Sequence, residues 1–291
     1  MNEKLYLGLD GGGTNCRARI SNAKGDILGE GSAGSSNTRL GIDVVYREIV
    51  SATTVALQVA GLSDTPLNQI YAGLGLAGLS LKSDQEKLLA FPHPFAGVTA
   101  NNDAYAACLG AHAGDDGGIF IFGTGSCGCA IVDGKDIYVG GWGFDISDVG
   151  SGAQAGLKAL RSALLAHDAV IEATELSKEL MQWFDNSPEK AVLWAADAKP
   201  ADYGQFAPLI SKHAALGDAL ALEIMTWSAE GAGQCIQALH KKGARTIALV
   251  GGFSDALEPW LGNDIRKILS SVRGDAMDGA LLMARRAFPG D

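Results

Sequence analysis

Two glycine-rich turns that end in hydroxyl residues are the part of this 291-residue chain best suited to chemistry. Each turn lies between two apolar runs, so each reads as the bend of a β-hairpin. Glycine lets the backbone approach a ligand, and successive N–H groups in such a turn form an anion-binding concavity. Either turn alone fits an ordinary hairpin, but two matching turns favour a polyphosphate held by both. The predicted phosphate-binding residues are Gly11, Gly12, Gly13, Thr14, Gly123, Thr124, Gly125 and Ser126.

A carboxylate precedes the first turn and is missing from the second. Asp10 ends the first apolar run, whereas Phe122 occupies the corresponding place before the second turn. A carboxylate beside phosphates is unfavourable unless a cation lies between them, and Mg²⁺ commonly bridges carboxylate and phosphate oxygens. The sequence therefore predicts a magnesium ion on the side of the first turn, with Asp10 as its ligand.

Asp103 is the candidate catalytic residue. It follows a short apolar run and precedes a run of small residues that reads as a helix, a place where side chains project from the edge of a sheet. Phosphoryl transfer to an alcohol needs a proton acceptor near the attacking hydroxyl, and Asp usually serves. An N-cap explains Asp at this place equally well, and Asn102 could supply that cap. The spacing alone therefore leaves cap and base evenly balanced.

A second polar cluster is the tryptophan loop, residues 140–152, which reads Gly-Gly-Trp-Gly-Phe-Asp-Ile-Ser-Asp-Val-Gly-Ser-Gly. Sugars are bound by carboxylates and amides that hydrogen-bond their hydroxyls, often beside an aromatic face. Asn37 supplies a further amide from a polar loop in the first half of the chain. The alternative is a plain turn with Asp148 as a helix N-cap, since loops carry binding residues but also simply connect elements.

Composition excludes several classes of protein. A net charge of −10 argues against a nucleic-acid or anionic-membrane surface. No apolar stretch reaches transmembrane length, and the N-terminus lacks a secretory pattern, so we expect a cytoplasmic protein. The five cysteines read as reduced, buried thiols. Cys127 and Cys129 lack the further partners of a zinc site and are interpreted as core packing.

Strands and helices alternate along the chain, which predicts mixed sheets flanked by helices. The two hairpins indicate a duplicated unit. The predicted helices span 42–60, 83–91, 104–112, 150–167 and 275–287, with a helical region at 172–242 broken near Pro188, Pro200 and Gly217. The predicted buried strands are 70–77, 98–101 and a final one at 246–250.

Taken in order, these motifs resemble a known family. Asp-Gly-Gly-Gly-Thr, Ser-Asn, Asn-Asp-Ala, Gly-Thr-Gly-Ser and Gly-Gly-Trp-Gly followed by Asp-x-Gly-Ser-Gly are similar to the N-acetylglucosamine kinase and bacterial glucosamine kinase branch of the BadF/BadG/BcrA/BcrD ATPases. The resemblance covers essentially the whole chain. It implies an α/β fold of two ribonuclease H-like (actin-like ATPase) lobes with a ligand cleft between them. Residues 1–104, completed by a helix at 275–291, would form one lobe and residues 105–274 the other.

The resemblance also implies a role for each residue of the motifs. ATP and Mg²⁺ are the implied cofactors, and Asp103 would accept the proton of the sugar 6-hydroxyl. The implied sugar-binding residues are Asn37, Thr38, Asp103, Gly141, Trp142, Gly143 and Asp148. The implied adenosine-binding residues are Ala214, Gly251 and Gly252.

The implied activity is phosphorylation of the 6-hydroxyl of glucosamine or N-acetylglucosamine. N-acetylglucosamine kinases carry Glu where this chain has Val149, which tilts the expectation slightly toward glucosamine, with Asp145 as a candidate partner for a free amine. Two alternatives stay open: an ATPase that activates a 2-hydroxyacyl-CoA dehydratase through an iron–sulfur cluster at Cys127 or Cys129, and a non-catalytic sugar- or nucleotide-binding regulator. The expected partner is a small amino sugar, without nucleic acid or membrane, and homodimers are common in the branch.

Overall fold

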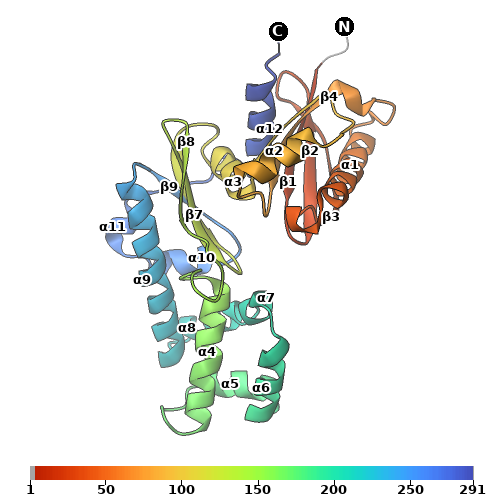
Figure 1. The fold of residues 1–291 in the computed structure, drawn as a ribbon. Coiled ribbons are helices and arrows are strands. Elements are labelled where there is room, and N and C mark those ends of the chain that lie inside the picture. The colour runs from red at the N-terminus through yellow and green to blue at the C-terminus, as the bar shows by residue number, and fades with distance from the viewer. Residues whose placement is uncertain (1–3, 291) are drawn as a thin grey trace. The chain divides into compact units, whose positions relative to one another are not determined.

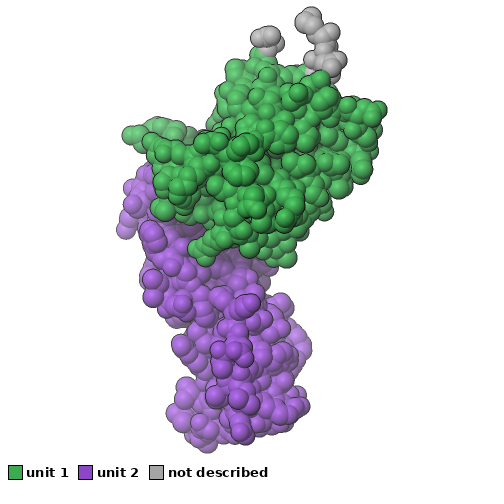
Figure 2. Space-filling model, turned by 45° about the vertical axis from the view of Figure 1, so that its right-hand side comes forward, with its two compact units in different colours: residues 1–117, 130–136, 271–291 green, residues 118–129, 137–270 purple. Residues whose placement is uncertain are grey.

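The computed structural model describes residues 4–290 and separates the chain into two compact units (Figure 2). The first unit comprises residues 1–117, 130–136 and 271–291, and the second comprises residues 118–129 and 137–270. Each unit contains residues that are distant in sequence, so chain order alone does not define either one.

The first unit is built on a five-stranded mixed sheet in the order β3-β2-β1-β4-β5. Its strands are β1 (Leu5–Gly11), β2 (Asn15–Ser21), β3 (Ile27–Gly34), β4 (Ile70–Leu76) and β5 (Gly97–Asn102). β1 runs antiparallel to β2 and parallel to β4, and β4 runs parallel to β5. Gly11 pairs with Leu76, and Leu76 pairs with Asn102, so three parallel strands end together at one edge.

A second five-stranded sheet, most of whose residues belong to the second unit, repeats this strand order. It runs β8-β7-β6-β9-β10, formed by β6 (Gly117–Phe122), β7 (Ser126–Val132), β8 (Lys135–Gly140), β9 (Ile247–Val250) and β10 (Leu269–Ser270). β6 and β7 take the places of β1 and β2, which confirms the predicted duplication. The expectation that 246–250 holds the final strand is wrong, because β10 follows it. β10 has two residues, too short to show an alternating pattern.

Helices cover both faces of the first sheet (Figure 1). They are η1 (Thr38–Leu40), α1 (Ile42–Val59), η2 (Leu67–Gln69), α2 (Lys82–Ala90), α3 (Asp103–Ala111) and α12 (Ala276–Ala287). α1 packs on β2 and β3, while α12 packs on β1, β4 and α3. The close packing of α12 on β1 and β4 requires glycine at two positions, because a Cβ at Gly8 or Gly73 would collide with the backbone of α12.

An arginine fastens the start of α12 to the first sheet. Arg19 of β2 donates to both carboxylate oxygens of Asp275, at 2.9 and 3.0 Å, and to Asp278 at 2.5 Å. The Arg19 side chain is 13% exposed, so these charge-assisted bonds lie largely out of water. They join segments that are 256 residues apart and bring the C-terminal helix into the first unit.

The described part of the second unit contains more helices than the first unit, from short turns to one of 23 residues. Its helices are α4 (Gly152–His167), α5 (Glu175–Trp183), α6 (Pro188–Asp197), α7 (Pro200–Gly204), α8 (Ala207–Ala215), α9 (Ala219–Lys241), α10 (Ser254–Leu257), η3 (Glu258–Trp260) and α11 (Asn263–Arg266). Pro188 and Pro200 begin helices, where the N–H that proline lacks has no partner to lose. Gly217, at φ +83°, separates α8 from α9. Within residues 4–290, no helix has both the length and the apolar character needed to cross a membrane.

Candidate active site

Asp10 and Asp103 approach each other at the edge where β1, β4 and β5 end. Asp10 pairs with Gly75 of β4, and Gly75 pairs with Asn101 of β5. A Cβ on Gly75 would lie 3.7 Å from the Cα of Asp103, the first residue of α3. The absence of a side chain at Gly75 therefore lets α3 begin close to Asp10.

The N-cap of α3 is Asn102. Its Oδ1 accepts a hydrogen bond from the N–H of Tyr105 at 2.7 Å, and its backbone is extended, as a cap residue requires. Asp103 lies one residue inside the helix, and its Oδ1 accepts from the N–H of Ala104 at 2.9 Å. The N-cap alternative for Asp103 is therefore not supported, because Asn102 caps this helix, and the role of Asp103 as a base stays a prediction.

Burial and a neighbouring charge act together on Asp103. Burial raises the pKa of its carboxyl above the ordinary value of 3.8, the N–H of Ala104 opposes this, and the negative charge of Asp10 raises the pKa further. Asp10 itself accepts a hydrogen bond from Arg17 Nη2 at 2.6 Å. The edge therefore holds a carboxyl group, that of Asp103, whose pKa is higher than that of a free Asp.

The two carboxylates fit a magnesium ion only in part. Mg²⁺ is usually bound through one or two carboxylates together with substrate phosphates and water. Among residues 4–290, no group of three or more His, Cys, Asp or Glu side chains is placed to hold a metal. An ion at Asp10 would accordingly depend on phosphate oxygens for much of its coordination.

Asn37 lies beside the first glycine turn. The Nδ2 of Asn37 is 4.0 Å from the position that a Cβ on Gly13 would take. The hydroxyl of Ser35 donates to Gly12 O at 3.1 Å and joins the loop to the turn. Asn37 Oδ1 accepts from the N–H of Arg39 at 3.0 Å, which fixes the amide plane. The structure therefore brings Asn37 and the first turn together within one unit.

Thr38 is held against the end of β4. Its N–H donates to Ala77 O at 3.0 Å, and its hydroxyl donates to the same carbonyl at 3.4 Å. Gly78, at φ +85°, passes so close that a Cβ would lie 2.7 Å from the Thr38 hydroxyl and 2.8 Å from Asn37 Oδ1. The backbone at residue 78 thus leaves room for both predicted sugar-binding side chains.

The second glycine turn is bonded to the start of α4. Gly123 N donates to Gly125 O at 3.0 Å, and Gly152 N donates to Gly123 O at 2.9 Å. The hydroxyl of Ser126, which is 5% exposed, donates to Val149 O at 2.7 Å. Ser126 thus contributes its hydroxyl to the protein's own structure, and the exposed Thr124 presents the other hydroxyl of this turn.

A cavity of about 620 Å³ joins the second turn to the segment after β9. Its volume is in the range of small-molecule and cofactor sites. The lining residues are Gly123, Thr124, Gly152, Gly204, Ala207, Pro208, Ser211, Gly252, Phe253 and Ala256. Two predicted groups, the second turn and Gly252, therefore line one space within the second unit.

Two other predicted adenosine residues lie next to this cavity without lining it. Gly251 has φ +103°, and a Cβ there would collide with the backbone of Phe122, so it serves the bend that presents Gly252. Ala214 is buried in α8, one turn beyond the lining residue Ser211. Sequence reasoning missed Ala207, Pro208 and Ser211, because small residues on a helix carry no motif.

Asp148 connects the tryptophan loop to the second turn. Burial raises the pKa of its carboxyl above the ordinary value, while backbone hydrogen bonds with Gly143 and Ser126 oppose the shift. Ser151, not Asp148, caps α4, since its hydroxyl accepts from the N–H of Gln154 at 3.2 Å. The alternative interpretation of Asp148 as a helix N-cap is therefore wrong.

The rest of the tryptophan loop is more exposed. Trp142 is 78% exposed, and Asp145 is also exposed. Gly141 lies over Cys127, where a Cβ would be 2.8 Å from the Sγ atom. Cys129 is fully buried, in agreement with its interpretation as core packing, whereas Cys127 and Cys235 are only partly buried, so the expectation of buried thiols is wrong for these two.

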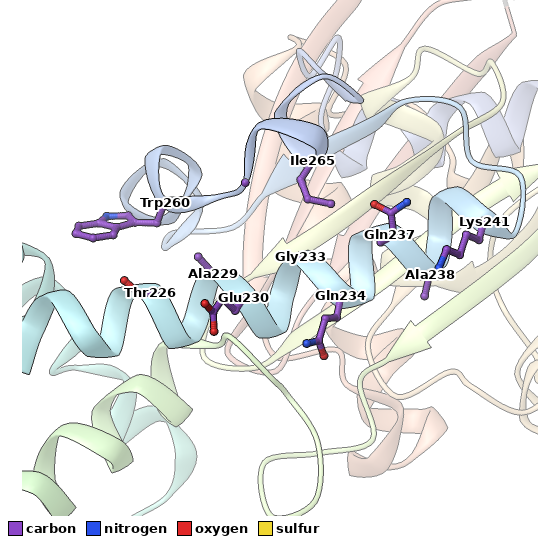
Figure 3. Close-up of a pocket in the computed structure, with 11 residues that line it drawn as sticks. Thr226, Ala229, Glu230, Gly233, Gln234, Gln237, Ala238, Lys241, Trp260 and Ile265 are labelled. Carbon is purple, nitrogen blue, oxygen red and sulfur yellow. The ribbon is translucent and has the colours of Figure 1, made fainter.

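A second cavity, of about 660 Å³, runs along α9 and contains none of the predicted site residues (Figure 3). Glu230, Gln234, Gln237 and Lys241 from α9 line it together with Trp260 and Ile265. Most of these polar side chains are solvated, so the cavity has the character of an open groove.

Two sheets of the same strand order, each with a glycine turn after its first strand, define an actin-like ATP-binding fold. The chain belongs to the BadF/BadG/BcrA/BcrD ATPase family, whose model matches residues 7–283.

The chain is also similar to individual sugar kinases and to a solved structure. The chain is 43% identical over 279 residues to a glucosamine kinase of Vibrio cholerae, covering 96% of this chain and 95% of that protein. It is 27% identical to an N-acetyl-D-glucosamine kinase of Dictyostelium discoideum, covering 83% and 81% of the two chains. A crystal structure from Chromobacterium violaceum, provisionally assigned as an N-acetylglucosamine kinase, has a TM-score of 0.88 at 31% identity, covering 97% and 99%.

We expect Asp10→Asn to lower the pKa of Asp103, because it removes a negative charge that stabilises the protonated carboxyl. Carboxyl ¹³C chemical shifts followed by NMR across an acidic pH titration would measure this. Asp43→Asn, an acid-to-amide change in the first turn of α1, is the control and should leave the Asp103 titration where it is. An unchanged Asp103 pKa in Asp10→Asn would contradict the coupling.

We expect Gly252→Val to weaken ATP binding about tenfold or more, because the added side chain enters the 620 Å³ cavity. A Cβ at this glycine meets no atom within 4 Å, so the fold should accept it. Gly262→Val, at another glycine with open space around its Cβ, is the matched control. Calorimetric titration with ATP would measure the affinity of both variants. Equal affinities would contradict the prediction that this cavity binds the nucleotide.

Proposed function

We propose that this protein is an ATP-dependent kinase that phosphorylates the 6-hydroxyl of glucosamine or N-acetylglucosamine, with a slight preference for glucosamine. The observation that carries the proposal is the state of Asp103: a partly buried carboxylate beside Asp10, free of the capping role, with a raised pKa. The names of the relatives support the class of substrate, since each is a glucosamine or N-acetylglucosamine kinase.

In this mechanism Asp103 accepts the proton of the attacking hydroxyl. The sugar oxygen forms a bond to the γ-phosphorus, the bond from that phosphorus to the β,γ-bridging oxygen breaks, and the proton passes to the Asp103 carboxylate. The raised pKa strengthens Asp103 as a base but requires a higher pH for its ionisation. Turnover should therefore fall on the acid side at a higher pH than a free Asp would impose.

The two glycine turns are proposed to bind phosphates. Neutral donors come from the backbone N–H groups of the turns 11–14 and 123–125, other than those of Gly12 and Gly123, which are bonded to Asn15 O and Gly125 O, and from the hydroxyls of Thr14 and Thr124. Asp10 would hold Mg²⁺, which when bound neutralises phosphate charge. The Arg17–Asp10 ion pair orients the Asp10 carboxylate.

The proposed sugar residues are Asn37, Thr38, the tryptophan loop and Asp148. Asn37 offers an amide whose orientation is fixed by Arg39, and Asp148 offers a carboxylate fixed by backbone N–H groups. Val149 in place of a glutamate removes one negative group from the loop, and the exposed Asp145 is a candidate carboxylate for a free amine. These features favour the amino sugar in either acyl state and tilt only slightly toward glucosamine.

The proposal also includes a cytoplasmic enzyme, supported by five cysteines that are all free thiols. Cys129 is fully buried and Cys127 packs against Gly141, so neither supports the iron–sulfur alternative.

We expect ADP release from MgATP to depend on an amino sugar. The measurement is a coupled ADP assay with glucosamine, N-acetylglucosamine, glucose or no sugar, followed by NMR of the product to locate the phosphate. Turnover with one amino sugar and phosphate at carbon 6 supports the proposal. ADP release that is independent of any sugar would instead favour the ATPase-activator or regulator alternatives.

We expect Asp103→Asn to reduce kcat by about 10²–10⁴-fold while ATP binding is retained, because the amide keeps the shape but accepts no proton. Asp43→Asn is the control, since both residues are acids in the first turn of a helix. Steady-state kinetics and ATP titration would measure both variants. Wild-type turnover in Asp103→Asn would overturn the assignment of the base.

A further inference from the structure

Gln154, in the first turn of α4, holds the middle of the tryptophan loop. Its Nε2 donates to Phe144 O and, at 3.3 Å, to Ser147 O. A glutamine amide nitrogen has two N–H groups, so these two carbonyls use both. We propose that Gln154 is a positioning residue that sets the affinity for the amino sugar by fixing this loop, an inference that rests on the proposed function.

Apolar burial contributes little to the order of this segment. Trp142 is 78% exposed and Ile146 is 84% exposed, so neither side chain anchors the loop in a core. A segment with few buried apolar contacts depends on its hydrogen bonds for a single conformation. Gln154 supplies the side-chain hydrogen bonds at Phe144 O and Ser147 O, beside the backbone bonds from Ile146 and Ser147 to Gly143 O.

Two other contacts hold the loop at different points. The ring of Phe144 stacks on Tyr203 of α7, with centroids 5.4 Å apart and planes 23° apart. The Asp148 carboxylate is hydrogen-bonded by the backbone of Gly143 and Ser126. Gln154 supports residues 144–147 between these points, and hence the segment that joins Trp142 to Asp148.

The start of α4 is joined to the second turn, beside the proposed nucleotide cavity, by hydrogen bonds that do not involve the Gln154 side chain. Gly152 lines that cavity and donates to Gly123 O at 2.9 Å, and Ala153 N donates to Thr124 O at 3.3 Å. These are backbone contacts, which a side-chain change at Gln154 leaves in place. Loss of the Gln154 amide should therefore affect the sugar and spare ATP.

The test uses Gln154→Met, which keeps the length of the side chain and removes both donors. Gln154→Glu is the sharper variant, because a carboxylate has no donor and faces two carbonyl oxygens. Gln234→Met is the matched control: Gln234 is exposed on α9 (Figure 3), and no hydrogen bond to its side chain occurs among residues 4–290. Each variant is assayed for KM of amino sugar and of MgATP, and for amide hydrogen exchange at residues 141–149.

We expect Gln154→Met to raise the sugar KM about tenfold, as loss of two hydrogen bonds predicts, with the MgATP KM unchanged and a larger effect in Gln154→Glu. Exchange at residues 141–149 should become faster in both variants, and Gln234→Met should match the wild type. An unchanged sugar KM, or equal rises in both KM values, would overturn the proposal. If no sugar is turned over at all, the proposed function fails, and unchanged exchange would separately refute the role of Gln154.

Discussion

The first unit depends on the close approach of α12 and α3 to each other and to the sheet. Glycines at positions 8 and 73 admit the backbone of α12 to β1 and β4, and glycines at 110 and 279 admit α3 and α12 to one another. Interiors are packed so tightly that one Cβ at such a contact forces the elements apart. This packing fixes where α3 begins, and therefore where Asp103 lies relative to Asp10. The Arg19 contacts with Asp275 and Asp278 hold the same helix by charge.

The two units use one architecture for different chemistry. In the first unit the strand edge carries charge: Asp10, Arg17 and Asp103 lie around the end of β1, and the burial of Asp103 and the charge of Asp10 together raise the pKa of the Asp103 carboxyl. In the second unit the corresponding turn carries no carboxylate, and a cavity lined mainly by glycine and apolar residues opens beside it. A repeated fold can thus present a charged edge in one copy and a neutral nucleotide-sized cavity in the other.

At the starts of α3 and α4, two nearby polar residues could each cap the helix, and only one of them does. Asn102 caps α3, so the Asp103 side chain is not needed as its cap; Ser151 caps α4, and Asp148 joins the tryptophan loop to the second turn. In each pair the sequence shows two residues able to cap, and only their backbone positions say which one does. The two hydroxyl residues of the second turn also differ: Thr124 is exposed, whereas the hydroxyl of Ser126 donates to Val149 O.

The sequence by itself determined the duplication, the positions of the glycine turns, the helices from α1 to α4 to within two residues at each end, and the family. These follow from local patterns: apolar periodicity, glycine and proline positions, and the order of motifs. The tertiary structure alone decided that Ala207, Pro208 and Ser211 line the cavity, that β10 joins the second sheet, and that Gln154 is hydrogen-bonded to the tryptophan loop. Each of these depends on which side chains meet across segments that are separate in the chain, and small apolar residues or a lone glutamine carry no local sign of the partner they will contact.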